Sequence, residues 1–208
     1  MILIGQYDSP FVRRVGIALT LYEVPFDHRP WSVFADAEKI SAYNPLIRVP
    51  TMVLDDGSVL IESHNMLDYL DRSVPAERAM FPSGEPARRQ ALKVAALATG
   101  MADKAVSLFY EKRLHKEASD VWVGRCRAQI SGVLAVLEAD RAARTSDYWF
   151  GSHLGHADIA VATALRFVSE AHPGLVAPAD YPALIAHAAR LEALPVFRKI
   201  DQPFIPPT

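Results

Sequence analysis

The chain has 208 residues, half of them hydrophobic and 22% charged, and its formal net charge is -2. This balance is typical of a globular protein with one or two domains, and neither the charge nor the pI of about 6.4 indicates nucleic acid or an anionic membrane as a partner. No apolar run approaches the roughly 20 residues that span a bilayer, and the N-terminus lacks the basic lead of a secretory signal. Because Cys126 is the single cysteine, no internal disulfide can form, and we expect a cytoplasmic protein.

The first 76 residues mix strand and helix patterns. The tight-turn signal Asp55-Asp56-Gly57-Ser58 separates two short apolar runs, which predicts an antiparallel hairpin. In chain order, we expect a strand at residues 1–5, a helix at 10–21, a strand at 26–30, a short irregular helix at 32–43, a hairpin at 44–61 and a helix capped by Ser63. This order predicts an α/β layer with a mixed sheet.

From residue 87 onward, the sequence is rich in alanine, leucine and charged residues at helical spacing. Helices are expected at residues 87–116 with a bend at Gly100, at 119–144, at 157–171, at 183–191 and from Leu194. The third of them is apolar nearly all round, which is typical of a buried central helix. The prolines of the last six residues, Pro203, Pro206 and Pro207, predict an irregular tail.

Prolines at positions 75, 82 and 86 mark the junction between these two kinds of sequence. The predicted organisation is an α/β domain at residues 1–76, a linker at 77–86 and an all-helical domain at 87–208. The seven histidines are scattered along the chain without metal-ligand spacing, so no metal site is predicted.

Ser9 stands where the first strand is expected to give way to the first helix. Serine is a favoured N-cap, and Pro10 suits the first helical position. A hydroxyl there lies beside unpaired backbone N–H groups and the positive end of the helix dipole, so the position stabilises an anion such as a thiolate. Helix capping alone explains the same two residues, so both interpretations stay open at this point.

Three motifs resemble those of the bacterial glutathione S-transferase family, in the family's order and spacing. They are Ser9-Pro10-Phe11-Val12-Arg13-Arg14, Asn44-Pro45-Leu46-Ile47-Arg48-Val49-Pro50 and Glu62-Ser63. The resemblance covers nearly the whole chain. It implies a thioredoxin-like N-terminal domain that binds reduced glutathione. It also implies an all-helical C-terminal domain that lines the binding site of an electrophilic, mostly apolar co-substrate. It also implies a homodimer without a metal or redox cofactor.

The resemblance implies that the Ser9 hydroxyl hydrogen-bonds the glutathione sulfur and stabilises its thiolate. Lowering a thiol pKa from about 8.5 by about two units requires about 2.7 kcal/mol of preferential anion stabilisation. A charge-assisted hydrogen bond of roughly 1.5–3 kcal/mol and a helix N-terminus together supply it. Tyr7 is the alternative, because some family branches use a tyrosine at the end of the first strand. The Ser-Pro-Phe-Val-Arg context fits the serine/cysteine type better.

The predicted glutathione-binding residues are Phe11, Arg48, Val49, Pro50, Glu62 and Ser63. By resemblance, the Val49–Pro50 bond is expected to be cis, and Val49 is expected to present its backbone to the peptide as a strand edge does. Ser63 would offer its hydroxyl and backbone N–H to the γ-glutamyl carboxylate, while Glu62 would pair with the ammonium group. Arg48 would pair with the carboxylate of the glycine end, although a solvated surface arginine explains it nearly as well.

Two positions depart from the family pattern. Ile47 replaces the usual glycine before the basic residue, and Gly155 replaces the usual serine or threonine three residues before Asp158. A glycine cap costs only a few tenths of a kcal/mol relative to serine, so Asp158 is still expected to anchor the loop before the central helix. By the same resemblance, Asp103 is a candidate for the cleft.

Several aromatic residues and arginines could serve either the structure or the function of the protein. Phe109, Tyr110 and Trp122 are candidates for the wall of an apolar co-substrate site, but aromatic residues at helical spacing are more often part of the core. Arg13 and Arg14 are expected to form structural ion pairs, for example with the helical domain, rather than to act in catalysis.

The resemblance therefore implies a detoxifying glutathione transferase in which the bound thiolate attacks an electrophile. Two alternatives stay open. One is a transferase-like protein that binds partners or regulates, with little catalysis, because a fold alone does not determine a function. The other is a glutathione-dependent isomerase or dehalogenase, which would use the same thiolate. The sequence does not predict the identity of the second substrate.

Overall fold

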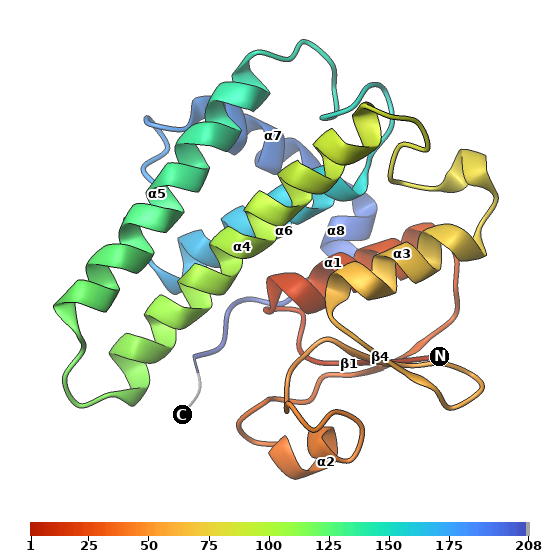
Figure 1. Cartoon of the computed structure of the whole chain (residues 1–208), viewed down its shortest axis with the longest axis horizontal. Coiled ribbons are helices and arrows are strands. Elements are labelled where there is room, and N and C mark those ends of the chain that lie inside the picture. The colour runs from red at the N-terminus through yellow and green to blue at the C-terminus, as the bar shows by residue number, and fades with distance from the viewer. Residues whose placement is uncertain (207–208) are drawn as a thin grey trace.

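The computed structural model describes residues 1–206 and shows an α/β layer beside an all-helical layer (Figure 1). The strands β1 (Ile2–Ile4), β2 (Asp27–Arg29), β3 (Thr51–Val53) and β4 (Val59–Ile61) form one sheet in the order β2-β1-β3-β4. β2 pairs parallel with β1, whereas β3 pairs antiparallel with both β1 and β4. The predicted mixed sheet and hairpin are confirmed, with strands shorter than expected.

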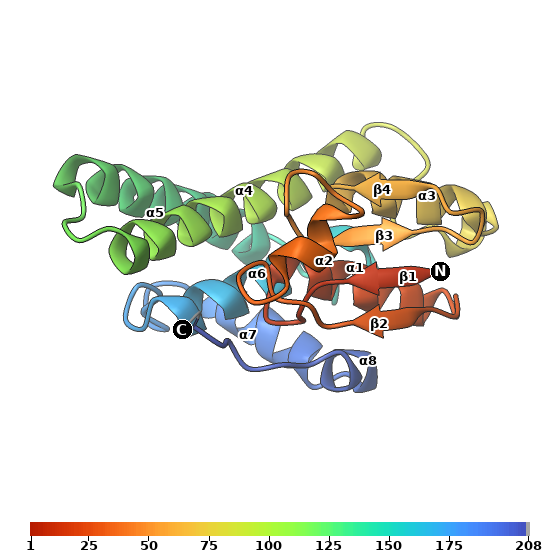
Figure 2. The same ribbon diagram turned by 90° about the horizontal axis from the view of Figure 1, so that it is seen from below.

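Helices cover both faces of this sheet. Helices α1 (Pro10–Leu21) and α3 (Ser63–Ser73) lie on one face, and the short α2 (Ala37–Ser41) lies on the other. Figure 2 shows the four strands side by side, with α2 on the near side and α1 behind them. A 3-10 turn, η1 (Ala76–Arg78), follows α3. This arrangement is the thioredoxin-like layer that the sequence predicted.

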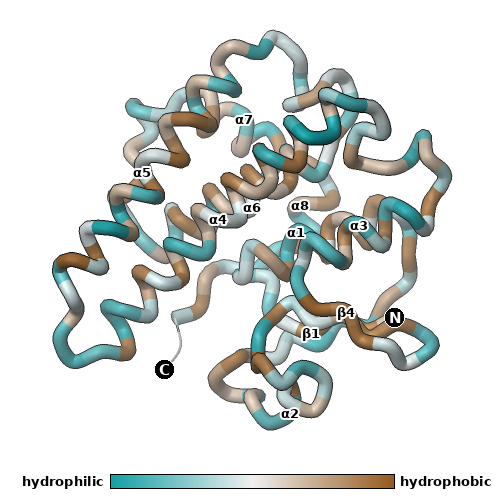
Figure 3. The backbone as a smooth tube through the Cα atoms, in the orientation of Figure 1, coloured by the Kyte–Doolittle hydropathy of each residue, from teal (hydrophilic) through white to brown (hydrophobic). Residues whose placement is uncertain are grey.

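The second layer consists of helices that pack around α6. Its helices are α4 (Ala87–Leu114), α5 (Asp120–Ala142), α6 (His156–Ala171), α7 (Pro182–Glu192) and α8 (Pro195–Lys199). α6 is buried along nearly its whole length, and Figure 3 shows hydrophobic residues recurring where it passes behind α4. The predicted central helix is thus confirmed. The bend expected at Gly100 does not interrupt α4, which is one helix of 28 residues.

The start of α6 depends on one buried carboxylate. Asp158 is 1% exposed, and its Oδ2 accepts the Gly155 N–H at 3.0 Å. Its Oδ1 accepts the Trp149 N–H at 2.8 Å and lies 3.1 Å from Nε2 of His187 on α7. Because Gly155 has no side chain to cap the helix, Asp158 satisfies the N–H groups of the loop. The expected anchoring role of Asp158 is confirmed.

The two layers share one hydrophobic core. Ile159 and Ala162 of α6, together with Leu191 and Phe197, pack in the same cluster as residues of β1, α1 and α3. Arg13 of α1 adds an ion pair to Glu192, with Nη1 2.6 Å from Oε1, so its predicted structural pairing with the helical layer is confirmed.

The predicted linker, residues 77–86, is fastened to both layers. The Met80 N–H donates to the Tyr22 hydroxyl at 2.9 Å, and the Phe81 N–H donates to Asp71 Oδ2 at 3.0 Å. Asp71 also accepts from Nε2 of His156 on α6 at 2.7 Å. The His156 N–H of α6 donates to the Met80 carbonyl at 3.3 Å, so this segment contacts both layers, and the domain boundaries drawn around it remain predictions.

The tail after α8 returns to the α/β layer. The Gln202 side chain accepts the Tyr7 N–H at 3.1 Å, and the Ile205 N–H donates to Asp8 Oδ2 at 3.2 Å. Residues 201–206 contain no helix or strand, as predicted for this proline-containing segment. Pro207 and Thr208, which end the predicted helical domain, lie outside the described residues. Within residues 1–206, every helix is too short or too polar to cross a lipid bilayer.

Candidate functional site

Ser9 is the N-cap of α1, as predicted. Its backbone is extended (φ −70°, ψ 121°), and its Oγ lies 3.4 Å from the Val12 nitrogen, which donates to it. Gly5 has φ +127°, and a Cβ there would lie 2.6 Å from Val12 Cγ2 and 2.7 Å from Val49 Cβ. Glycine at that point lets β1 turn closely into α1, which brings Ser9 beside the loop that precedes β3.

The loop before β3 presents the backbone of Val49 beside Ser9 and the cleft. The Val49–Pro50 peptide bond is cis, as expected. Asn44 Nδ2 donates to the Arg48 carbonyl at 3.1 Å and to Thr51 Oγ1 at 3.0 Å, which fixes the loop on both sides of Val49. Among residues 1–206, nothing hydrogen-bonds to the N–H or carbonyl of Val49. An extended peptide can pair with these two groups as with a strand edge.

Glu62 and Ser63 lie at the start of α3. The structure places Glu62 at the N-cap and Ser63 in the first turn, so the predicted cap is wrong by one position, a difference typical of helix ends. Glu62 has φ +68°, an uncommon conformation for a residue with a side chain. Its Oε1 lies 3.2 Å from Arg48 Nη1, and both side chains are about half exposed. Ser63 is 2% exposed.

Arg14 is a buried cation beneath Ser63. It is fully buried, and Nη1 donates to Ser63 Oγ at 3.4 Å. Among residues 1–206, its Nε and Nη2 have no hydrogen-bond partner and no carboxylate pairs with it. The predicted ion pair of Arg14 is therefore wrong. Burial lowers the pKa of Arg14 to about 9, so it keeps its charge at neutral pH.

A cleft of about 780 Å³ opens between the two layers in front of Ser9. The predicted residues Ser9, Phe11, Arg48 and Val49 line it from the α/β layer. Asp103, Phe109 and Tyr110, which were only candidates, line it from α4. Pro50, Glu62 and Ser63 lie outside its lining, although Glu62 adjoins it through Arg48. Trp122 lies apart on α5, with Lys104 Nζ 5.9 Å from its ring centroid.

Several cleft residues were not singled out from the sequence. Phe34 of the β2–α2 segment packs edge-on against Tyr110, with ring centroids 5.5 Å apart. Phe204 and Ile205 of the tail close another side. Asp8 reaches the same cleft, and burial raises its pKa. Of these residues, only Phe204 and Ile205 carry a sequence feature that could have suggested a place in the cleft, because they are apolar residues between the prolines of the tail.

Tyr7 faces away from this cleft. It is 9% exposed, and its ring stacks on His28 with centroids 3.8 Å apart. The ring also packs on Gly16 of α1, where a Cβ would lie 2.8 Å from Tyr7 Cε1. Burial raises the pKa of Tyr7 to about 12, so the phenol stays protonated. This geometry is that of a core residue, as the sequence context indicated.

Comparisons with known proteins agree with this architecture. Two family models match the chain, the glutathione S-transferase N-terminal domain over residues 3–78 and the glutathione S-transferase C-terminal domain over residues 120–190. A glutathione S-transferase from Methylobacterium radiotolerans, solved in complex with glutathione sulfonate, is 28% identical. It has a TM-score of 0.92, and the match covers 100% of this chain and 97% of that one.

Two further relatives bear on function. A glutathione transferase family member from Pseudomonas fluorescens Pf-5, solved with bound glutathione, is 32% identical, with a TM-score of 0.82 over 98% of this chain and 99% of that one. The probable maleylacetoacetate isomerase 2 of Drosophila melanogaster is 27% identical over 99% of this chain and 91% of its own length.

The protein has a thioredoxin-like layer and a helical layer, and the cleft between them contains a site after the end of β1 and at the N-terminus of α1. The chain belongs to the glutathione S-transferase family, as its motifs indicated.

Proposed function

We propose that this protein is a glutathione transferase of the serine type. One observation carries the proposal: the Ser9 hydroxyl lies at the N-terminus of α1 and lines a cleft whose opposite wall is aromatic. The relatives solved with glutathione sulfonate and with glutathione support the same ligand here. The hydroxyl and the helix N-terminus would stabilise the thiolate, and the aromatic wall would hold an apolar electrophile.

The proposed peptide contacts use groups that are incompletely paired. The Val49 N–H and carbonyl would pair with the cysteinyl part of glutathione, and Phe11 would border the sulfur from α1. Arg48 and Glu62, which now pair with each other, would separate to hold the glycine carboxylate and the γ-glutamyl ammonium group. Ser63 would bind the γ-glutamyl carboxylate at the N-terminus of α3.

The proposed reaction needs no cofactor beyond the peptide itself. The glutathione thiol loses its proton to solvent water, and Ser9 donates a hydrogen bond to the thiolate that results. The sulfur lone pair then forms a C–S bond to the electrophilic carbon, while the leaving group departs with the displaced electron pair. Ser9 itself forms no covalent bond.

A second candidate is an isomerase, because the Drosophila relative is named as a probable maleylacetoacetate isomerase. Such a substrate is a carboxylic acid. Among the described residues that line the cleft, Arg48 is the only cation, whereas Asp8 and Asp103 are carboxylates. This charge pattern favours an uncharged electrophile, so we rank transferase above isomerase.

Two measurements test the proposal. Calorimetry with reduced glutathione at up to millimolar concentration is expected to show binding, and assays with uncharged aromatic electrophiles are expected to show consumption of glutathione. Turnover of a maleyl acid without net glutathione consumption would instead establish the isomerase. Binding without turnover of any electrophile would favour a regulatory protein, and no binding at all would refute the proposal.

Arg14 is expected to strengthen glutathione binding from below Ser63. Because its guanidinium donates to Ser63 Oγ, the Ser63 hydroxyl hydrogen is free to point toward a carboxylate, and the buried charge adds to the helix dipole. Arg14→Met is expected to weaken glutathione binding about tenfold with little change in kcat, and Arg14→Lys to recover part of the loss.

The matched control for this prediction is Arg72→Met on the same helix as Ser63, since the Arg72 side chain is 78% exposed. It should leave glutathione binding unchanged. Removing a buried charge that no carboxylate of residues 1–206 neutralises is not expected to lower stability, so both variants should unfold at or above the wild-type temperature. Unchanged glutathione affinity in a folded Arg14→Met protein would contradict the positioning role.

The resemblance also implies a cytoplasmic homodimer, and we include both in the proposal. Three apolar side chains are exposed on β4, α3 and α4, namely Val59, Tyr69 and Leu92, and Figure 2 shows β4 and α3 next to each other with the start of α4 nearby. The exposed apolar residues of these three elements are candidates for the dimer surface.

A further inference from the structure

An aromatic lining runs through the cleft from the β2–α2 segment to the tail. Its rings come from that segment, from α4, from α6 and from the tail, namely Phe34, Tyr110, Phe109, Phe167 and Phe204. The Tyr110 ring lies edge-on to Phe34 and Phe109, with centroids 5.5 and 6.3 Å apart. The Phe204 ring lies edge-on to Phe109 and Phe167, with centroids 5.1 and 5.5 Å apart. Because the face of an aromatic ring is electronegative, such a lining can hold a cation as well as an apolar group.

Asp8 places a carboxylate beside this lining. It directly precedes Ser9 and lines the same cleft. Its Oδ2 accepts the Ile205 N–H at 3.2 Å, which ties it to the residue that follows Phe204. Among residues 1–206, no lysine, arginine or histidine lies at ion-pair distance from this carboxylate. The carboxylate therefore faces the cleft with its charge not neutralised by these residues.

The charge of Asp8 acts on the aromatic lining. Burial raises the pKa of Asp8, although the N–H groups of Ile205 and Ser9 oppose this shift. Burial also raises the pKa of Tyr110, and the negative charge of Asp8 raises it further. A cation in contact with Asp8 would favour the ionised carboxylate, so the carboxylate and the cation would stabilise each other.

The other charged groups of the cleft leave this negative charge in place. Asp103 Oδ2 lies 3.2 Å from Lys104 Nζ, so its charge is already compensated. Arg48 is the cation that the proposed function assigns to the glycine carboxylate of glutathione, and the bound thiolate would add a further negative charge. With glutathione in place, the surroundings of the second substrate would therefore be negative.

We propose that the cleft prefers electrophiles that carry a positively charged ammonium group, and that Asp8 determines this preference. The inference rests on the proposed transferase function and names the class of its second substrate. The ammonium group lies against the Asp8 carboxylate and the rings of Tyr110 and Phe204. Because Asp8 and Ser9 are consecutive, with Cα atoms about 3.8 Å apart, the ammonium group is expected close to the reacting carbon. The charge pattern that disfavours an acid thus favours a cation over an uncharged compound of the same shape.

The probes are two glutathione conjugates of the same shape, S-[2-(trimethylammonio)ethyl]glutathione and S-(3,3-dimethylbutyl)glutathione. They differ only in a quaternary nitrogen that replaces a quaternary carbon, and hence in one positive charge. Conjugates are compared because a positive charge also changes the intrinsic reactivity of an electrophile. Calorimetry with the full chain at neutral pH is expected to give a Kd about tenfold lower for the ammonium conjugate.

Asp8→Asn tests the role of the carboxylate. The variant loses the charge but keeps an oxygen that can accept the Ile205 N–H, so it is expected to fold and to bind both conjugates. Its two Kd values should be about equal. The matched control is Asp180→Asn, which removes the same charge from an exposed position before α7 and should keep the preference of the wild type. Unfolding temperatures check that both variants are folded.

The comparison separates failure of this inference from failure of the transferase function. Equal affinities in the wild type, an unchanged preference in Asp8→Asn, or equal losses of preference in the two variants would each overturn the inference alone, because the conjugates would still bind. Binding of reduced glutathione without binding of either conjugate would also overturn it alone. If neither the conjugates nor reduced glutathione bind, the transferase function is refuted and the inference with it.

Discussion

Ser9→Ala is expected to lower kcat/KM for an electrophile about 10- to 100-fold at neutral pH, since a charge-assisted hydrogen bond contributes roughly 1.5–3 kcal/mol to the thiolate. Without the hydroxyl, the thiol pKa in the complex should rise toward about 8.5, and the rate should then recover as pH increases. The measurements are the pH profile of the rate and the ultraviolet absorption of the bound thiolate.

The control for Ser9 is Tyr7→Phe. The Tyr7 phenol lies in the core against His28, so its loss should leave the pH profile unchanged. Ser9→Ala also removes a helix cap, which is expected to cost about 1 kcal/mol of stability, so glutathione binding is measured in parallel to show that the variant is folded. An active Ser9→Ala protein with an inactive Tyr7→Phe protein would reverse the assignment.

Asp158→Ala is expected to produce the largest loss of stability, about 3–5 kcal/mol in the free energy of unfolding, because it removes a fully buried carboxylate with several partners. The N–H groups of Trp149 and Gly155 would lose their acceptor inside the protein. Denaturant unfolding measures the loss. Asp180→Ala, on an exposed position before α7, is the control and should change stability by less than about 0.5 kcal/mol.

A loss below about 1 kcal/mol in Asp158→Ala would mean that solvent replaces its hydrogen bonds, and that the loop before α6 is held by other contacts. The variant is not expected to affect thiolate formation directly, since Asp158 lies outside the cleft. Activity and stability should therefore separate between Ser9→Ala and Asp158→Ala.

Local chemistry explains which features were predictable from the sequence. Ser9 and Pro10 indicate a helix start because capping depends on the residues themselves. The hairpin followed from its turn residues, and α6 followed from its apolar composition. Each of these features depends on residues that are close in the sequence, so it can be predicted without knowing the fold.

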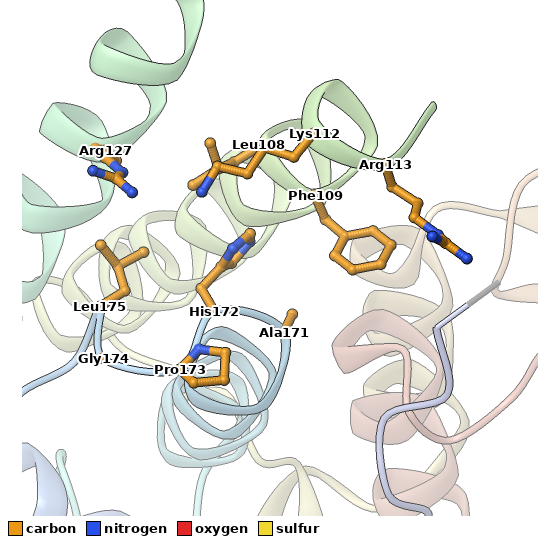
Figure 4. A pocket seen from close by; sticks show the side chains of 10 residues that line it. All are labelled: Leu108, Phe109, Lys112, Arg113, Arg127, Ala171, His172, Pro173, Gly174 and Leu175. Carbon is orange, nitrogen blue, oxygen red and sulfur yellow. The ribbon is translucent and has the colours of Figure 1, made fainter. Parts of the chain in front are cut away.

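Features that depend on the meeting of distant segments were not predictable. Arg14 resembled an ordinary helical arginine, and only the fold shows that no carboxylate of residues 1–206 reaches it while Ser63 does. Phe34 and Phe204 line the cleft because the β2–α2 segment and the tail meet α4, and no periodicity in the sequence encodes that meeting. The cavity that Lys112, Arg127 and His172 line likewise forms only because α4, α5 and the loop after α6 are packed together (Figure 4).

The core shared by the two layers limits how this protein can be recombined with its relatives. Exchanging its whole helical half for another would replace Ile159, Ala162, Leu191 and Phe197, which complete the packing beneath α1. A chimera joined between the two layers would thus have a poorly packed core as well as new residues lining the cleft. The smaller exchangeable unit is the cleft-facing part of α4 with the tail, so changes in specificity can accumulate there while the interior stays fixed.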